Sequence, residues 1–146
     1  MAKIVEKSAQ IESAPETVWG LLINVSSWKT WWPDCIDAKT ADGRTLREGS
    51  NIELVLQPRH SKLTFRPTVD MMTEGRKLSL TYLSPLMKAT VTWEVAEGPT
   101  GARILVRGVF KGFQVWLMGV LGTNHVFQTT INGNARGLKK MAEKMV

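Results

Sequence analysis

The chain has little of the residues that covalent and metal chemistry require. Its 146 residues include one cysteine, two histidines and one tyrosine. A single Cys35 cannot form an internal disulfide, so nothing in the sequence requires an oxidising compartment. One cysteine with His60 and His125 gives no ligand spacing that resembles a zinc site. We therefore expect neither a disulfide framework nor a bound metal.

Long apolar runs and targeting signals are also missing. The first seven residues carry charges where a signal peptide would need an apolar run. The segment between Lys111 and Arg136 has no charged residue, but amides and a histidine interrupt it too often for a membrane span. These are Gln114, Asn124, His125, Gln128, Asn132 and Asn134. We expect a cytoplasmic protein with no transmembrane segment.

The short motifs of several enzyme classes do not occur. The sequence has no G-x-S-x-G, no H-E-x-x-H, no phosphate-binding loop and no G-x-G-x-x-G. No short motif in the sequence therefore supports a hydrolase, metalloprotease or nucleotide-dependent activity. We assign no catalytic residue and no cofactor, and whether the protein is an enzyme stays open at this point.

Positive charge is in excess but scattered. Nineteen Lys and Arg against thirteen Asp and Glu give a net charge of +6 and a pI near 9.7. A nucleic-acid partner would require that charge to gather on one face. The only cluster lies at the end of the chain, in Arg136, Lys139, Lys140 and Lys144. We expect no nucleic-acid partner.

The first 33 residues predict a strand and two short helices. Residues 3–11 alternate loosely, as in a strand. Ser13, Pro15 and Glu16 form a helix start, with Ser13 as the cap. Ser26 or Ser27 is expected to cap the second helix, which Pro33 closes. That helix carries three tryptophans: Trp28, Trp31 and Trp32.

Residues 34–110 change to a period of two, with turn residues between the runs. One face is apolar and the other polar, which is typical of an antiparallel meander with one covered face. Leu63, Phe65, Val69 and Met71 are expected on the covered face. The predicted strands are 35–40, 51–57, 62–72, 77–83, 88–96 and 102–110.

The end of the chain predicts one long helix, from about Phe113 to Val146, with a kink near residue 120. Asn132-Gly133 is a turn signal that opposes this interpretation. The glycines of the segment also weaken a helix, and we attribute them to close approach of the helix to the sheet. They are Gly119, Gly122, Gly133 and Gly137.

This order of elements resembles the START/Bet v 1-like (SRPBCC) superfamily, which includes polyketide cyclase/dehydrase and lipid-transport proteins. The similarity runs over essentially the whole chain. The residues that carry it are 11–19, Val25-Ser-Ser-Trp28 through Trp32-Pro33, Gly43 with Leu46 and Gly49, Trp93-Glu94-Val95, Gly101, Phe110-Lys-Gly112 and 138–143. The resemblance implies a single α+β domain over residues 1–146 with a helix-grip fold. In that fold a curved antiparallel sheet of about seven strands wraps around the C-terminal helix, with an apolar cavity between them.

If this fold is right, aromatic and aliphatic side chains line the cavity, as a small-molecule pocket requires. Each of these residues is also a candidate for ordinary core. Asn124 and Tyr82 stand out because a buried polar group needs a hydrogen-bond partner, which a ligand, a strand backbone or a water supplies. The candidate ligand-binding residues are Trp28, Trp31, Trp32, Leu54, Leu56, Phe65, Met71, Tyr82, Trp93, Phe110, Trp116, Val120, Asn124 and Phe127.

Three functions remain open. The first is binding of a small hydrophobic or amphipathic ligand, such as a lipid, a polyketide or a quinone-like molecule. The second is a cyclase/dehydratase-type enzyme with Tyr82, Asn124 or His125 as the proton handler. The third is an interaction module, because the face of residues 112–135 is neutral where an exposed helix normally carries charge. A second copy, giving a homodimer, or another protein would cover that face.

Overall fold

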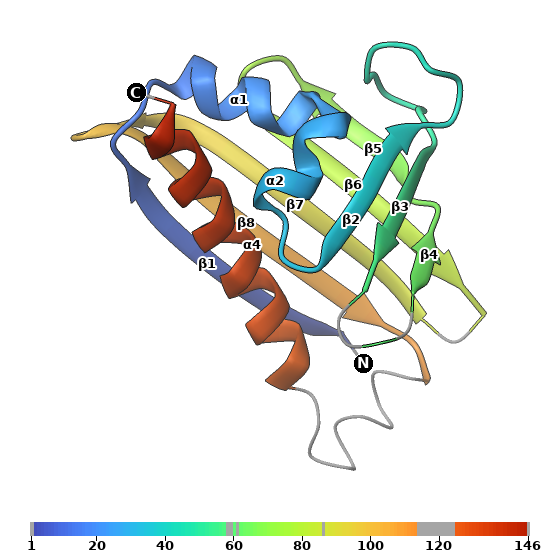
Figure 1. The fold of residues 1–146 in the computed structure, drawn as a ribbon. Helices are drawn as coiled ribbons and strands as arrows, with labels where there is room; N and C mark the ends of the chain where they lie inside the picture. The colour runs from blue at the N-terminus through green and yellow to red at the C-terminus, as the bar shows by residue number, and fades with distance from the viewer. Residues whose placement is uncertain (1, 58–59, 61, 86, 114–124, 146) are drawn as a thin grey trace.

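Eight strands in two antiparallel sheets surround one long helix in the computed structural model, which describes residues 2–57, 60, 62–85, 87–113 and 125–145 (Figure 1). The strands are β1 (Lys3–Ile11), β2 (Cys35–Thr40), β3 (Ile52–Leu56), β4 (Leu63–Phe65), β5 (Thr68–Thr73), β6 (Lys77–Ser84), β7 (Met87–Gly98) and β8 (Gly101–Lys111). The helices are α1 (Pro15–Ile23), the 3-10 turn η1 (Val25–Ser27), α2 (Trp28–Trp31) and α4 (His125–Lys144).

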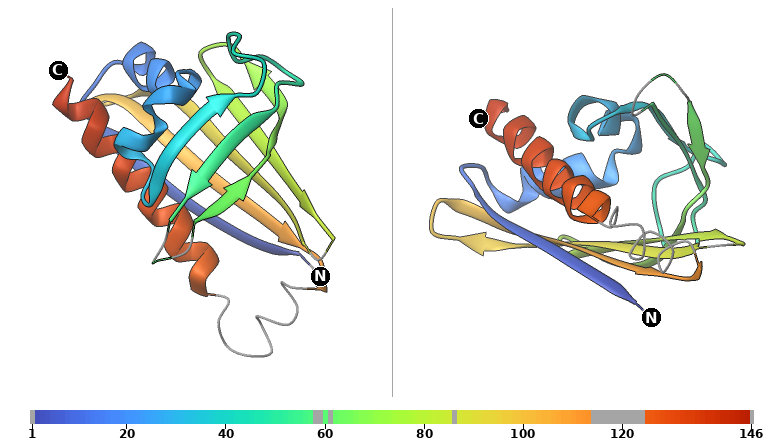
Figure 2. Two further views of the ribbon diagram at one scale, coloured as in Figure 1. Left: turned by 45° about the vertical axis from the view of Figure 1, so that its right-hand side comes forward. Right: turned by 90° about the horizontal axis from the view of Figure 1, so that it is seen from below.

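The five-stranded sheet has the order β1-β8-β7-β6-β5, and the three-stranded sheet has the order β2-β3-β4. A bridge between Asn51 and Thr68 and a 2.9 Å bond from Ile52 N to the Pro67 carbonyl join the two sheets. Seen from below, α4 lies over the inner face of the larger sheet and the smaller sheet rises at its side (Figure 2). The α+β helix-grip arrangement is therefore present, with eight strands in two sheets where about seven in one were expected.

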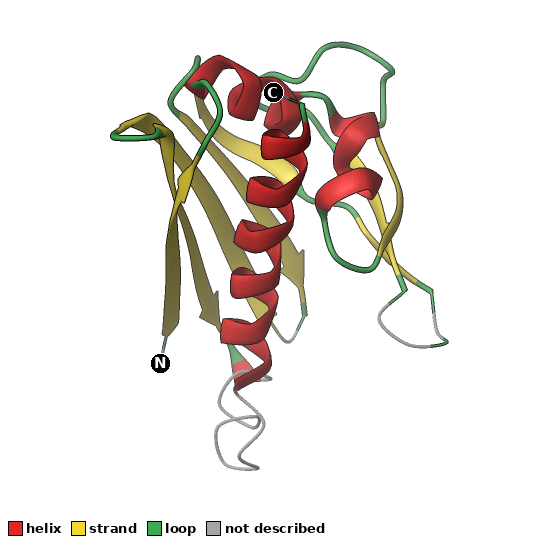
Figure 3. Cartoon of the chain, turned by 60° about the vertical axis from the view of Figure 1, so that its left-hand side comes forward, coloured by secondary structure: helices red, strands yellow, loops and turns green. Residues whose placement is uncertain are grey.

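The alternation of the strands explains which face α4 covers. Along β7 the side chains of Ala89, Val91, Trp93 and Val95 are buried, and the residues between them are exposed or half-buried. Gly108 of β8 leaves room for the Phe110 ring and for the helix, because a methyl group there would lie 2.7 Å from Phe110 Cε2 and 3.1 Å from Ile131 Cδ1 of α4. Figure 3 shows α4 running along this covered face of the sheet. Among the described residues, no helix is both long and apolar enough to span a membrane.

The predicted strand over 62–72 is wrong in two ways. Pro67 lacks a backbone N–H, and the run divides there into β4 and β5. A bulge between Val69 and Met71 then shifts the period by one residue. Met71 consequently points outward and is 43% exposed, while Met72 packs against the core. Met71 is therefore not a cavity residue, and Leu63, which is 44% exposed, also leaves the covered face.

The predicted serine caps are also corrected. The N-cap of α1 is Ala14, and the hydroxyl of Ser13 is buried without a hydrogen-bond partner among the described residues. Ser27 Oγ donates to the carbonyls of Leu21 and Asn24 instead of capping α2. Pro15 does occupy the first turn of α1, as predicted.

Helix α4 continues through Asn132-Gly133, so the turn signal there does not end it. Its glycines approach α2 and the following turn rather than the sheet. A methyl group at Gly137 would overlap the carbonyl oxygen of Trp31, and one at Gly133 would lie 3.3 Å from Pro33 Cγ. The segment with the predicted kink, including Gly119 and Gly122, lies outside the described residues.

The last turn of α4 is bound to the connection between β1 and α1. Glu143 Oε2 accepts hydrogen bonds from the Glu12 backbone N–H at 2.9 Å and from Lys139 Nζ at 2.8 Å. Lys139 Nζ also donates to the Gln10 carbonyl. The N–H of Glu12 and then Lys139 hold the pKa of the Glu143 carboxyl below its ordinary value of 4.5. The ionised form is therefore the one that the fold favours.

This contact predicts an acid-dependent loss of stability. A lowered folded pKa adds stability above the ordinary pKa, and that stability is lost as the pH falls through the folded value. We expect Glu143→Gln to lower the free energy of unfolding at neutral pH and to have little effect below the folded pKa. Urea unfolding at the two pH values measures this. Glu97→Gln, exposed at the end of β7, is the control, and an E143Q effect equal at both pH values would contradict the prediction.

Candidate ligand-binding site

Four tryptophans fill one end of the space between the sheet and α4. Trp28, Trp31 and Trp32 of the α2 region pack on Trp93 of β7, with ring centroids between 5.2 and 6.5 Å apart. The four rings are at most 7% exposed. Trp28 Nε1 donates to the Leu22 carbonyl at 2.9 Å, which ties the cluster to α1. In this structure the rings contact one another and pin α2 to the sheet.

A buried amide completes this cluster. Asn134 of α4 is 2% exposed, and its Oδ1 accepts a hydrogen bond from Trp93 Nε1 at 2.6 Å. Asn124 is the amide predicted from the sequence, and Asn134 was not predicted. The signal was present, because Asn134 falls at helical spacing between Ile131 and Leu138, both of them buried. Trp31 Nε1 is buried and has no acceptor among the described residues.

The other end of the covered face is lined by four aromatic rings, of which Phe65 and Tyr82 are half-buried and Phe110 and Phe127 are buried. Phe65 of β4 and Tyr82 of β6 meet edge to face, with centroids 6.1 Å apart, and both are half-buried. Phe110 of β8 and Phe127 of α4 stack at 4.3 Å. The strand register places the small Ala89 between Tyr82 and Phe110. We call Phe65, Tyr82, Ala89, Phe110 and Phe127 the aromatic wall.

The remaining predicted residues divide between core and undescribed chain. Leu54 is fully buried, and Leu56 is half-buried against the core beside the aromatic wall. Trp116, Val120 and Asn124 lie outside the described residues, as does the side chain of His125. Within the described part of the chain, no group of three or more His, Cys, Asp and Glu side chains is placed to hold a metal ion.

The ionisable groups near the wall are neutral. Burial raises the pKa of the Tyr82 phenol well above its ordinary value of 10, and the nearby Cys35 adds to the shift. Burial also raises the pKa of the Cys35 thiol, which donates to the Asp37 carbonyl at 3.5 Å. Both groups therefore stay protonated at neutral pH. The wall offers a phenol hydrogen-bond donor in apolar surroundings.

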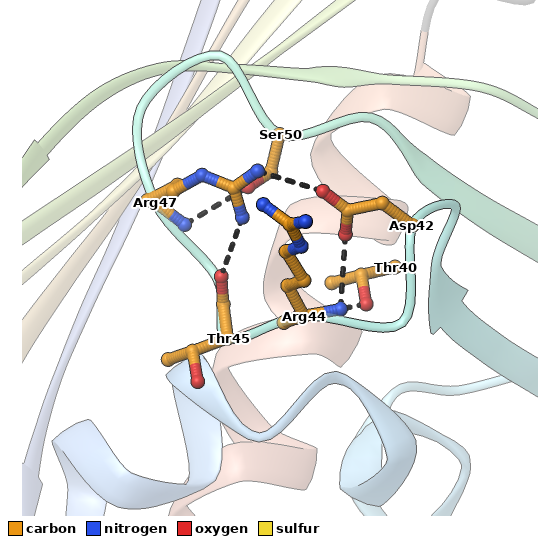
Figure 4. A network of polar contacts seen from close by, with 6 residues as sticks. All are labelled: Thr40, Asp42, Arg44, Thr45, Arg47 and Ser50. Atoms are coloured by element: carbon orange, nitrogen blue, oxygen red, sulfur yellow. Dashed lines mark hydrogen bonds and ion pairs between the residues drawn. The ribbon is translucent and has the colours of Figure 1, made fainter.

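A connected polar network lies elsewhere, in the loop between β2 and β3 (Figure 4). Asp42 accepts from the backbone of Arg44 at 3.0 Å and from Arg47 Nη2 at 2.7 Å. The Arg44 N–H and then Arg47 lower the pKa of the Asp42 carboxyl. Arg47 also donates to the Thr45 carbonyl, and its backbone N–H donates to Ser50 Oγ. These bonds close the loop on itself, so we assign the network to loop structure.

Comparison with known proteins agrees with this geometry. The profile of the family described as polyketide cyclase/dehydrase and lipid transport matches residues 2–143. The chain belongs to that family, and its fold is START-like (SRPBCC). No curated protein sequence matches the chain significantly.

Solved structures share the fold at low sequence identity. One is the di-domain ARO/CYC StfQ from the steffimycin biosynthetic pathway, with a TM-score of 0.78, 16% identity and coverage of 99% of this chain. The present chain covers 52% of StfQ, about half its length. A START superfamily protein from Mycobacterium smegmatis has a TM-score of 0.76 at 15% identity, covering 98% of this chain and 99% of its own. TTHA0849 from Thermus thermophilus has a TM-score of 0.77 at 15% identity, with the same two coverages.

Proposed function

We propose that the protein binds a small hydrophobic or amphipathic ligand, such as a lipid, a polyketide or a quinone-like molecule, between the sheet and α4. The observation that carries this proposal is the partial exposure of two rings of the aromatic wall, those of Phe65 and Tyr82. Phe65 and Tyr82 lie on the covered side of the molecule, yet they are only half-buried, whereas the tryptophan cluster at the other end is closed. Aromatic side chains with a single oriented donor are the lining that such ligands require.

The wall also supports the chemical class of the ligand. Its described side chains carry no charge at neutral pH, so an ionised group placed against them would lose its hydration without compensation. The Tyr82 hydroxyl can donate to a carbonyl or hydroxyl oxygen of the ligand. Among the residues predicted from sequence, the contact set that we propose is Leu56, Phe65, Tyr82, Phe110 and Phe127.

Native mass spectrometry of the purified protein, compared with its mass after denaturation, tests the proposal. We expect a bound small molecule that is released on unfolding. The same spectrum distinguishes a monomer from the homodimer that the uncharged face of residues 112–135 predicts. An empty chain that also fails to bind the apolar probe anilinonaphthalene sulfonate would contradict ligand binding.

A pair of variants tests whether the ligand binds at the aromatic wall. Ala89→Leu adds bulk to the aromatic wall, and Ala96→Leu adds the same bulk to the outer face of the same strand, where Ala96 is exposed. We expect A89L to lose most of the bound molecule or probe and A96L to keep it. Circular dichroism establishes that both are folded. Equal ligand content in the two variants would show that the ligand does not bind at the aromatic wall.

The second candidate is a cyclase/dehydratase-type enzyme, which the family description and the likeness to StfQ favour. Because burial raises its pKa, Tyr82 stays protonated at neutral pH and can donate a hydrogen bond to a substrate ketone, but it cannot act as a base. With a poly-β-ketone substrate, Tyr82→Phe should then lower kcat while binding is retained. Unchanged turnover in that variant would remove Tyr82 from any catalytic role.

A further inference from the structure

The outer face of the sheet ends in an apolar and basic row that the proposed ligand site does not use. Strand register aligns Leu83 of β6, Lys88 of β7 and Lys111 of β8. Leu83 is 77% exposed, and Phe113, two residues beyond Lys111, is 57% exposed. Both lysines are exposed. We call Leu83, Lys88, Lys111 and Phe113 the Lys88 rim.

The charge of the rim is not compensated within the described protein. Lys88 and Lys111 are directly opposed across two strands, an arrangement that is unfavourable for like charges. Neither forms an ion pair with a described residue. Residues 54–69, 75–93 and 98–142 contain no Asp or Glu. The rim therefore favours an anionic partner.

Glu6 is the next acidic side chain along this outer face, and it lies too far from the two lysines to neutralise them. It is opposed by Arg107, which is separated from Lys111 by two steps of the outward-facing alternation along β8. Two such steps span about 13 Å, since a strand rises ~3.3 Å per residue. That distance exceeds the screening length of about 8 Å at physiological ionic strength. The positive potential at the rim therefore persists.

Between the lysines lies a shallow hollow of about 210 Å³. The β6–β7 turn that forms one side is held by Ser84, whose hydroxyl donates to the Met87 carbonyl and accepts from the Met87 N–H. Its lining consists of Ser84, Pro85, Met87, Lys88, Lys111, Gly112 and Phe113. Two ammonium groups beside a hollow of this size suit a phosphodiester head group, with apolar side chains at its edge.

We propose that the Lys88 rim docks on an anionic lipid bilayer. The two lysines contact lipid phosphates, while Leu83 and Phe113 enter the boundary between head groups and acyl chains, the arrangement of interfacial membrane binding. A second copy of the chain fits less well, because a two-fold contact through the rim would bring the lysines of both copies together. The inference does not rest on the ligand site, since docking needs no occupant there.

Co-sedimentation with vesicles tests this inference. The vesicles are phosphatidylcholine alone and an equimolar mixture of phosphatidylcholine and phosphatidylglycerol, each at low and high salt. The test variant is Leu83→Ser with Lys88→Glu. The matched control is Lys144→Glu with Met145→Ser, which makes the same charge change at the C-terminal end of α4, where Met145 is 55% exposed. The C-terminus lies at the end of the molecule opposite the end of β8 (Figure 1). Circular dichroism and thermal unfolding establish that both variants are folded.

We expect the unchanged chain to bind the mixed vesicles at low salt, to bind phosphatidylcholine weakly, and to dissociate at high salt. The L83S/K88E variant should bind the mixed vesicles at least about tenfold more weakly, since each lysine near such a surface contributes on the order of a fivefold change in affinity. The control variant should bind like the unchanged chain. Equal loss in both variants would show that overall charge, not the rim, drives binding, and would overturn the proposal. Absence of vesicle binding, or a dimer that only L83S/K88E dissociates, would also overturn it.

Discussion

Trp93→Phe is expected to lower the free energy of unfolding by about 2–4 kcal/mol, although it keeps an aromatic ring at the position. The smaller ring leaves a gap beside three buried tryptophans. It also removes the N–H that Asn134 Oδ1 accepts at 2.6 Å, and Asn134 is 2% exposed, so water cannot replace that donor. A buried acceptor without a donor retains its full desolvation cost. Urea unfolding followed by far-ultraviolet circular dichroism measures the change.

Trp19→Phe is the matched control for this prediction. Trp19 is also buried, and its Nε1 donates to Glu74 Oε1 at 3.2 Å, but Glu74 is exposed and water can replace the lost donor. The control should therefore lose clearly less stability. The double variant Trp93→Phe, Asn134→Leu should recover part of the loss, since removing both partners of a buried bond is less costly than removing one. Equal losses at Trp93 and Trp19 would contradict a special role for Asn134.

Gly137→Ala is expected to destabilise the protein by about 1–3 kcal/mol, despite alanine being the better helix former. A methyl group at this position would overlap the backbone oxygen of Trp31, which cannot rotate away as a side chain would. Helix α4 would have to move away from α2, which would open the tryptophan cluster. The mid-point of urea unfolding reports the loss.

Two other helical glycines serve as comparisons for this prediction. Gly20 of α1 has no neighbouring atom within 4 Å of the position that an added methyl group would take, so Gly20→Ala should stabilise by up to about 1 kcal/mol. Gly133 is intermediate, with Pro33 Cγ at 3.3 Å. The expected order of stability is G20A, then G133A, then G137A. A G137A variant as stable as G20A would show that α4 and α2 are not held at this distance.

Sequence pattern alone predicted the elements where the pattern is regular. The strand over residues 3–11 is confirmed as β1, and the gaps between the predicted strands 62–72 and 77–83 and between 88–96 and 102–110 fall at turns between strands. The errors occur where a single residue interrupts a strand or shifts the alternation of inward and outward side chains. Pro67 divides a strand, and the bulge at Val69 moves Met71 from the inner face to the outer face. The alternation of apolar and polar residues does not reveal an inserted residue, because the pattern is equally regular on either side of a bulge.

The site was harder to predict than the fold, for a physical reason. Helical spacing allowed both Asn124 and Asn134 on the covered stripe, and only tertiary contact shows that Asn134 meets the indole of Trp93. The glycines of α4 gave a correct signal of close approach but not the partner, which is Trp31 rather than a strand. Side-chain pairs between distant segments depend on packing, and spacing within one segment does not determine them.

The tryptophan cluster gives the protein an internal optical reporter. The rings of Trp28, Trp31, Trp32 and Trp93 have centroids 5.2 to 6.5 Å apart, at interplanar angles from 28° to 86°. Indoles held this close in fixed, asymmetric orientations couple their electronic transitions, so the cluster is expected to contribute strongly to the near-ultraviolet dichroism of the protein. That signal disappears when tertiary packing loosens even if secondary structure remains. It therefore separates the packing of the α2 half from events at the aromatic wall, whose Phe and Tyr rings absorb at shorter wavelengths.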